Sequence, residues 1–248
     1  MTSTSESGHQ KNVANFDELI SFATGYGSTY KPTKTSLSID ALKALSEQAK
    51  AAHIAVVSAE AALKSAVAAR EAAFLPLSKL STRILNSIKA SDTTQQVDEN
   101  VRTVVRKIQG VRASAKKTDQ QKEALAEHGK KVVEISSSQM GFDSRLDNLF
   151  KLIQLLLSIP EYNPNEEELK IAYLNTLMED LKLKNAAVIE KTIPLSNARI
   201  SRNNILYKDD TGLCDMAMNV KTYLKSLFGP TSLEYKQISS LSFKKIKL

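Results

Sequence analysis

The sequence has little glycine, proline and aromatic character, and this scarcity restricts its fold class. It contains eight glycines, six prolines, no tryptophan and 6% aromatic residues in 248 positions. An average globular chain has about 7% glycine and about 5% proline, so a loop-rich sandwich, a propeller or a doubly wound nucleotide-binding fold is disfavoured. The hydrophobic fraction of 42% is sufficient for a sizeable core. The composition therefore predicts an all-α protein.

Residues that carry chemistry are also scarce. The single cysteine, Cys214, cannot form an internal disulfide, and we expect it to be a small buried residue rather than a nucleophile. The three histidines are His9, His53 and His128, and no pair of them has metal-ligand spacing. The motifs GxxxxGK[ST], GxGxxG and HExxH do not occur. We expect no catalytic, cofactor or metal site, and no enzyme.

The sequence also lacks a long hydrophobic run. The longest apolar stretch, residues 146–159, is interrupted by polar side chains, whereas about 20 apolar residues are needed to span a bilayer. Residues 1–11 are polar and contain no apolar signal region, so they are expected to form a flexible tail. These features predict a cytoplasmic protein without a membrane span.

An internal repeat appears when the chain is compared with itself at a shift of 132 residues. The shift places the Tyr-x-Pro sequence of residues 30–32 on that of residues 162–164. Over residues 30–70 it matches thirteen identical residues, where chance would give roughly 3. Shared helical periodicity explains matched leucines, but it does not explain the Tyr-x-Pro, Glu47/Glu179, Lys50/Lys182 and Arg70/Arg202 matches. We therefore predict a tandem duplication.

The repeat divides the chain into two similar helical halves. We expect repeat 1 in residues 12–112, a polar connector in 113–135 and repeat 2 in 136–248, with both halves sharing one core. Each half is predicted to have a short helix, a Tyr-x-Pro turn, a long helix and two shorter helices. The long helices cover residues 36–75 and 166–206 in this prediction, and Asn165 with Glu168 resembles a capping box. The predicted fold is an elongated bundle with these helices at its centre, antiparallel or crossing.

The first long helix carries a regular seam of alanine and leucine. Apolar residues follow at alternating spacings of three and four from Leu42 to Ala73, which is the heptad pattern of a coiled coil. Arg70 and Arg202 lie on this seam and match under the repeat. We expect each guanidinium to reach water from a helix end. The alternative is a pair of buried ion pairs with carboxylates such as Asp143 or Asp147.

The net charge of +7 is concentrated in two segments, residues 101–118 and 235–248, which contain no acidic residue. A solvated basic face is the simpler interpretation, because nucleic-acid binding proteins usually add stacking aromatics or a known reading fold. The alternative is a phosphate-binding surface. The candidate residues are Arg102, Arg106, Lys107, Arg112, Lys116, Lys117, Lys244, Lys245 and Lys247.

Two further segments carry a resemblance. The sequences Leu195-Ser196-Asn197-Ala198-Arg199 and Gly141-Phe142-Asp143-Ser144-Arg145-Leu146-Asp147 resemble those of hypothetical proteins of Bacteroidota-type bacteria. The likeness covers most residues after about Asn12. It implies a bacterial cytoplasmic origin, and it assigns no activity, ligand or site.

Together these observations predict a non-enzymatic structural or scaffold protein. The long seam favours helix–helix contacts with a protein partner or a second copy of the chain. The first alternative is a nucleic-acid-binding protein that uses the two basic segments. A weaker alternative is an enzyme of unknown class.

Overall fold

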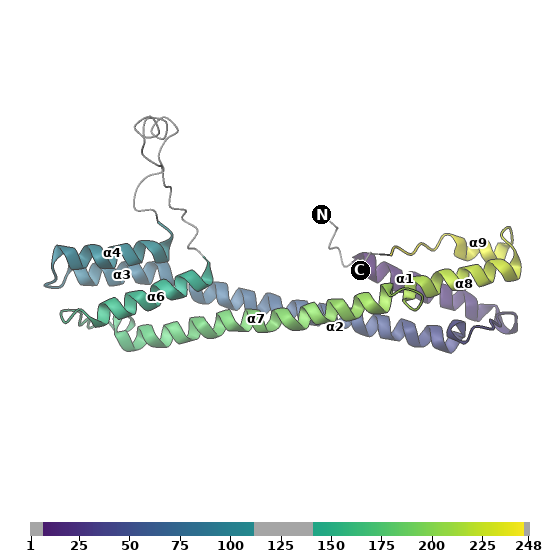
Figure 1. Ribbon diagram of the computed structural model, residues 1–248, viewed down its shortest axis with the longest axis horizontal. Helices are drawn as coiled ribbons and strands as arrows, with labels where there is room; N and C mark the ends of the chain where they lie inside the picture. The colour runs from purple at the N-terminus through teal and green to yellow at the C-terminus, as the bar shows by residue number, and fades with distance from the viewer. Residues whose placement is uncertain (1–6, 112–140, 246–248) are drawn as a thin grey trace, which may run out of the picture. The chain divides into compact units, whose positions relative to one another are not determined.

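The computed structural model describes residues 7–111 and 141–245, and throughout these residues every regular element is a helix (Figure 1). The predicted all-α class is therefore confirmed for the described part. The connector 113–135 lies outside the described residues. The α-helices are α1 (Ser7–Gly25), α2 (Ile39–Phe74), α3 (Leu77–Lys89), α4 (Gln95–Gln109), α6 (Phe142–Leu157), α7 (Ile171–Tyr207), α8 (Leu213–Phe228) and α9 (Leu233–Ser239).

The predicted helices agree with these elements except near some ends. Helix α1 begins at Ser7, so the predicted tail 1–11 is helical from that residue. Helix α7 begins at Ile171, after a 3-10 turn over Glu167–Leu169, and the capping box expected at Asn165 is wrong. The corresponding turn before α2 is Thr35–Leu37, and Ser38 then caps α2 by accepting a hydrogen bond from the amide of Ala41 at 3.3 Å.

Each Tyr-x-Pro turn is fixed by its tyrosine. The Tyr30 hydroxyl donates to the carbonyl oxygen of Leu37 at 2.7 Å, and the Tyr162 hydroxyl donates to that of Leu169 at 2.6 Å. Both rings are buried, and burial raises the pKa of each tyrosine to about 12. Each hydroxyl thus donates a hydrogen bond to a backbone carbonyl oxygen of the turn that precedes the long helix.

The described chain forms two compact units, and each unit combines segments that are far apart in sequence. Unit 1 comprises Met1–Lys64 and Lys191–Leu248, and unit 2 comprises Ser65–Glu190. Each unit therefore contains the start of one long helix and the end of the other. These boundaries differ from the predicted division into residues 12–112 and 136–248, and each unit has a hydrophobic cluster of its own in place of one common core.

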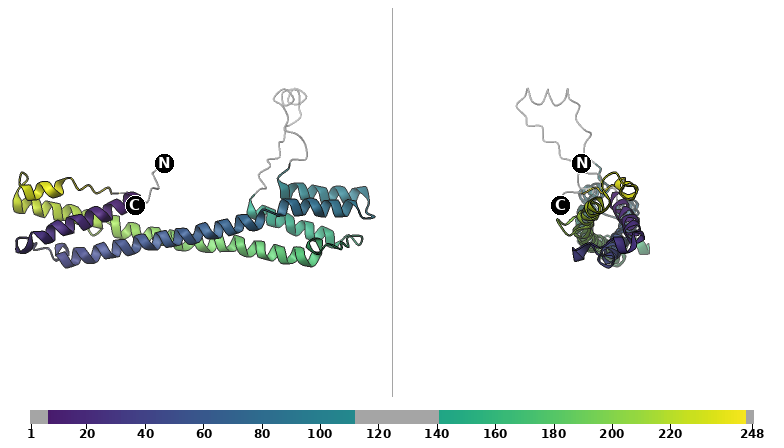
Figure 2. Two further views of the ribbon diagram at one scale, coloured as in Figure 1. Left: turned by 180° about the vertical axis from the view of Figure 1, so that it is seen from behind. Right: turned by 90° about the vertical axis from the view of Figure 1, so that its right-hand side faces the viewer.

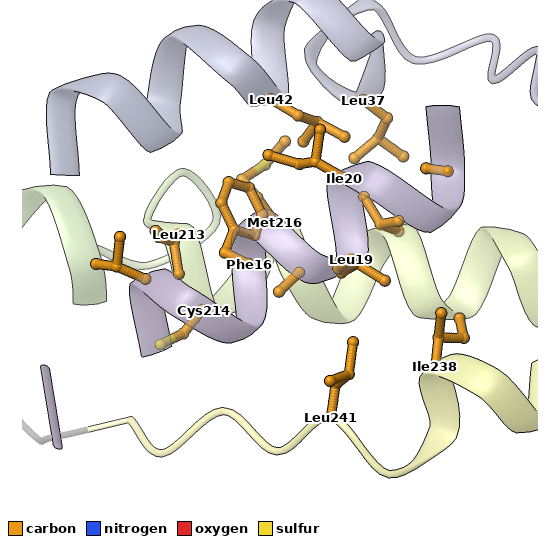
Figure 3. Packing of buried hydrophobic residues seen from close by; sticks show 14 of the residues in the cluster. Phe16, Leu19, Ile20, Leu37, Leu42, Leu213, Cys214, Met216, Ile238 and Leu241 are labelled. Atoms are coloured by element: carbon orange, nitrogen blue, oxygen red, sulfur yellow. The ribbon is translucent and has the colours of Figure 1, made fainter. Parts of the chain in front are cut away.

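Unit 1 is built around α1 and α8, which lie side by side (Figures 1 and 2). Phe16 and Leu19 of α1 are fully buried, and they join Leu42 of α2 and Leu213 of α8 in one cluster (Figure 3). The end of α7 adds Leu206 and Tyr207, and α9 adds Ile238. One face from each of these helices is therefore removed from water.

Unit 2 is built around α4, which packs on both α3 and α6. Its cluster joins Ile84 of α3, Val101 of α4, Leu149 of α6 and Leu174 of α7, all fully buried. The end of α2 contributes Phe74, whose ring stands edge-on to that of Phe142 at 4.9 Å between centroids. The two long helices therefore contribute to both clusters.

We predict that Leu174→Ala lowers the free energy of unfolding by about 2–5 kcal/mol, because it leaves a cavity in the unit 2 cluster. Leu183→Ala, on the same helix, is the matched control, since the Leu183 side chain is 69% exposed. It should change stability by less than about 0.5 kcal/mol. Urea unfolding followed by circular dichroism measures both. Equal effects of the two substitutions would contradict the described packing of α7.

Candidate functional site

One group of connected polar side chains lies in unit 2, where α2, α6 and α7 meet. Arg70 Nη1 donates to Asn185 Oδ1 at 3.1 Å, and Asn185 Nδ2 donates to Asp143 Oδ1 at 2.6 Å. Asn185 is 8% exposed. The amide thus bridges a cation on one helix and a carboxylate on another, with its acceptor and donor ends both used.

Two aromatic rings lie against the arginines of this group. The Arg70 guanidinium lies over the Phe142 ring at 3.8 Å from its centroid, and that of Arg145 lies over Phe74 at 5.4 Å. Arg145 Nη2 also donates to the carbonyl oxygen of Phe74 at 2.9 Å, and burial lowers the pKa of Arg145. Cation–π contact compensates part of the hydration that each guanidinium loses. We call Arg70, Arg145, Asn185, Asp143, Phe74 and Phe142 the polar bridge.

The polar bridge differs from both interpretations that the sequence offered for Arg70. The Arg70 side chain is half-buried, its guanidinium lies over the Phe142 ring, and Asn185 lies between it and Asp143. Arg202, the matching residue in unit 1, is 4% exposed, so the expectation that its guanidinium reaches water is wrong. Arg202 Nη2 donates to Asn203 Oδ1 at 2.8 Å. The two arginines share the seam position, but Arg70 is half-buried whereas Arg202 is buried, and their hydrogen-bond partners differ.

The chemistry of the polar bridge is that of a structural contact. Its ionisable side chains are two guanidiniums and one carboxylate, and they include no nucleophile that a general base could activate. Cys214, in unit 1, is buried as expected, and burial raises the pKa of its thiol to about 12. Among residues 7–111 and 141–245, no three His, Cys, Asp or Glu side chains could hold a metal ion together.

The basic candidate residues are distributed over both units. In unit 2, Arg102 on α4 pairs with Glu99 at 2.9 Å, and Arg106 donates to Thr103 Oγ1 at 3.1 Å. Lys107 lies in the last turn of the same helix. Arg112, Lys116, Lys117 and Lys247 lie outside the described residues. The structure thus describes three of the six candidates in 101–118.

In unit 1, Lys245 is held by two acidic side chains. Its Nζ lies 2.7 Å from Asp209 Oδ1 and 2.8 Å from Asp215 Oδ2. These hydrogen bonds raise the pKa of Lys245, and the bond from Lys245 is the largest of the effects that lower the pKa of Asp215. Lys244 is exposed, but its backbone is fixed by Asn12. The charge of Lys245 is therefore neutralised within unit 1.

Sequence reasoning missed a buried polar cluster near the start of α1. His9 was expected in a flexible tail, but it is 6% exposed and its Nδ1 lies 2.7 Å from the Tyr207 hydroxyl. Asn12 donates to the carbonyl oxygen of Lys244 at 2.9 Å and accepts from the amide of Lys244 at 3.0 Å. These partners are about 200 residues away in sequence, so local composition gave no signal for them.

The two long helices expose several large apolar side chains. The exposed fractions are 63% for Ile54 on α2 and 69%, 62%, 59% and 58% for Leu183, Ile189, Ile193 and Ile200 on α7. The stretch Ile39–Lys89, which contains α2, is also long and apolar enough to cross a membrane, and only 11% of its most apolar window is buried. Residues 146–159, on which the prediction of no membrane span rests, lie outside this stretch.

Comparison with protein-family models, with curated proteins and with solved structures finds no match to this chain. The geometry described above is therefore the basis for the functional inference.

We predict that Arg70 and Asn185 are energetically coupled. In a double-mutant cycle with Arg70→Ala and Asn185→Ala, the coupling energy should be about 0.5–3 kcal/mol, because the two side chains share one partly buried network. The exposed pair Arg102 and Glu99 is the control, for which less than about 0.5 kcal/mol is expected. Denaturant unfolding measures both cycles. A coupling no larger than that of the control would show that the polar bridge contributes nothing specific.

We also predict that Asp215→Asn lowers the melting temperature in a pH-dependent way. The pKa of Asp215 is lowered in the folded state, so its stabilisation is present above the ordinary carboxyl pKa of about 3.9 and is lost as the pH falls through the folded value. The wild type and the variant should therefore differ at neutral pH and converge in strong acid. Thermal melts across this range test the effect, and a difference that grows in acid would contradict it.

Proposed function

We propose that this protein is a non-enzymatic structural or scaffold protein that acts in the cytoplasm through helix–helix contacts with protein partners. The observation that carries the proposal is the set of large apolar side chains exposed on α7, among them Ile193 and Ile200. Monomeric soluble proteins expose scattered apolar residues, but branched side chains repeated along one long helix are typical of a protein-binding surface.

The polar bridge also supports a structural role. Arg70, Asn185 and Asp143 connect three helices and position no reactive group. A polar contact inside a helix seam can fix the register of the helices, as buried polar residues do in coiled coils. A scaffold needs a defined register because its surface residues must lie at fixed positions along the helix.

The nucleic-acid alternative receives less support from the described residues. Arg102 and Lys245 are already paired with acidic side chains of their own unit. A phosphate contact at either position would have to replace an existing ion pair, which lowers its net contribution. We therefore retain nucleic-acid binding only as an outcome of the test below.

We further propose that the chain arose by duplication of one helical segment. Several contacts recur at the repeat spacing of 132 residues: the hydrogen bonds from Tyr30 and Tyr162, and the ion pairs Glu47–Lys50 and Glu179–Lys182. Helices α2 and α7 also begin at the matched residues Ile39 and Ile171, each after a 3-10 turn. These recurring contacts support the proposal that the two halves are copies with similar local structure.

The proposed function predicts that the full chain enters a protein complex through its long helices. Affinity capture should recover a protein, or a second copy of this chain, with the wild type but not with a variant carrying Leu183→Glu, Ile193→Glu and Ile200→Glu. These positions are exposed, so the variant should keep the helical circular dichroism of the wild type. Equal recovery with both chains, or none with either, would contradict the proposal. Retention on DNA or RNA that decreases steeply with salt would favour the alternative.

A further inference from the structure

The segment that follows α9, residues 241–245, has no helical structure and lies along α1 and α8 (Figures 1 and 3). We call it the strap. Because its backbone polar groups are not paired within a helix, other groups must take up their hydrogen bonds. Side chains of α1 and α8 do so, and these are the contacts by which a protein binds an extended peptide.

Asn12 on α1 binds both backbone groups of one strap residue. Its Nδ2 donates to the carbonyl oxygen of Lys244 at 2.9 Å, and its Oδ1 accepts from the amide of Lys244 at 3.0 Å. A residue of a neighbouring antiparallel strand provides the same pair of hydrogen bonds. Asn12 is 2% exposed, and its Nδ2 also donates to the Tyr207 hydroxyl at 3.3 Å, so the amide is held in position for this contact.

Two further side chains bind carbonyl oxygens of the strap and of the last residue of α9. Asn15 on α1 donates to the carbonyl oxygen of Ser242 at 2.7 Å. Lys221 on α8 donates to those of Ser239 and Leu241 at 3.0 and 2.9 Å. Hydrogen bonds to the backbone can form with any sequence that follows the same extended course. They provide affinity without requiring a particular sequence.

The side chains of the strap alternate between the protein and water. Leu241 is 9% exposed and belongs to the hydrophobic cluster of unit 1, Phe243 packs half-buried against that cluster, and Lys245 binds two carboxylates. Ser242 and Lys244, which lie between them, are exposed. Residues two apart lie on one face of an extended chain. Sequence specificity at this surface therefore comes from an apolar residue, an aromatic residue and a base at alternate positions.

We propose that this surface of unit 1 is a peptide-binding site, and that the strap is a built-in ligand which an extended segment of a partner protein displaces. The residues that form the site, which we call the strap site, are Asn12, Asn15, Asp209, Asp215 and Lys221. The strap shows the chemistry of the ligand at its three inward positions. This inference goes beyond the proposed function, which depends on the exposed residues of α7.

The strap is suited to displacement because little of it is buried. Leu241 is the only buried residue among positions 241–245. The ion pairs of Lys245 are exposed, with side-chain exposures of 38% for Lys245 and 90% for Asp209, and exposed ion pairs contribute little to stability. The strap competes well mainly because its tether keeps it at a high effective concentration beside the site. A partner segment must therefore bind more tightly than the strap.

The basic position of the site allows such tighter binding. Asp209 and Asp215 both accept hydrogen bonds from the single ammonium group of Lys245. An arginine presents a planar fork of five donors and can bind carboxylates with two hydrogen bonds in fixed geometry. A partner segment with arginine at this position can therefore replace the strap. A second copy of this chain offers only the same lysine and gains no contact by exchange.

The test uses the full chain and a labelled peptide with the sequence of residues 239–245, blocked at both ends. A loosened chain carries Leu241→Asp and Lys245→Glu, which remove the apolar anchor and reverse the charge that faces Asp209 and Asp215. In fluorescence anisotropy, the peptide should bind this chain with a dissociation constant at least about tenfold lower than that of the wild type, since only the wild-type strap competes. An arginine in place of the last lysine of the peptide should tighten binding further.

Matched controls exist for the chain and for the peptide. A chain with Ser242→Asp and Lys244→Glu carries the same two acidic residues at exposed positions of the strap, and it should bind the peptide as the wild type does. Methylation of the peptide at the amide nitrogen of Lys244 removes the donor to Asn12 and should weaken binding at least about tenfold. Methylation at Phe243, whose amide has no acceptor among the described residues, should have little effect.

Cys214 reports whether the strap site is covered. Its Sγ lies 3.9 Å from the carbonyl oxygen of Lys244, and the residue is 2% exposed. Iodoacetamide should modify it at least about tenfold faster in the loosened chain than in the wild type, because local opening exposes the thiol. Adding the unlabelled peptide should restore the slow rate. Circular dichroism checks that the loosened chain keeps its helices.

Several results would overturn the proposal. These are peptide binding to the loosened chain that is no tighter than to the wild type, unchanged binding after methylation at Lys244, and a Cys214 that stays reactive under excess peptide. The last result would show that the strap is a fixed part of the fold. If the wild-type chain protects Cys214 of the loosened chain as well as the peptide does, a second copy is the ligand and the assignment to a partner protein fails. The strap variants leave α7 unchanged, so the capture experiment on α7 is decided separately.

Discussion

The structure depends on burying the apolar seam at both ends of each long helix. Helix α2 extends over 36 residues and α7 over 37. A helix in a protein owes most of its stability to the packing of its apolar face. In unit 1 the start of α2 is covered by α1 and α8, and in unit 2 its end joins α3 and α6. The shorter helices therefore serve to bury the apolar residues of these seams.

Two buried polar side chains of unit 1, Lys221 and Asn12, hold the segment that follows α9. Lys221 is 9% exposed, and its Nζ donates to the carbonyl oxygens of Ser239 and Leu241 at 3.0 and 2.9 Å. Burial lowers the pKa of this lysine. The Asn12 side chain donates to the carbonyl oxygen of Lys244 and accepts from its amide. The segment after α9 is thereby fixed by side chains from α1 and α8 rather than by secondary structure of its own.

Much of the fold could be predicted from the sequence because helices and turns are determined by residues close together in the chain. The Tyr-x-Pro turns end one helix and precede another, and the seam spacing identifies the buried face near the start of α2, where Leu42 is fully buried. Helix α8 is one of the two shorter helices predicted to follow the second long helix. These features follow from propensity and periodicity alone.

Other features depend on contacts between distant segments and could not be predicted. His9 and Asn12 are ordered by Tyr207 and Lys244, and composition around residue 9 indicates only a polar tail. The amide of Asn185 lies between Arg70 and Asp143 because three helices meet there, which one helical pattern cannot reveal. The exchange of helix segments between the units is also a property of the tertiary fold.

Each unit is completed by helices from both halves of the chain, so neither half is expected to bury its apolar residues alone. The most direct measurement is to divide the chain between Val111 and Gly141, express the two pieces separately and together, and follow their folding and mass. The account predicts that the pieces form a 1:1 complex with cooperative unfolding, since units 1 and 2 each take helices from both. A single piece that remains monomeric and unfolds as cooperatively as the full chain would contradict it.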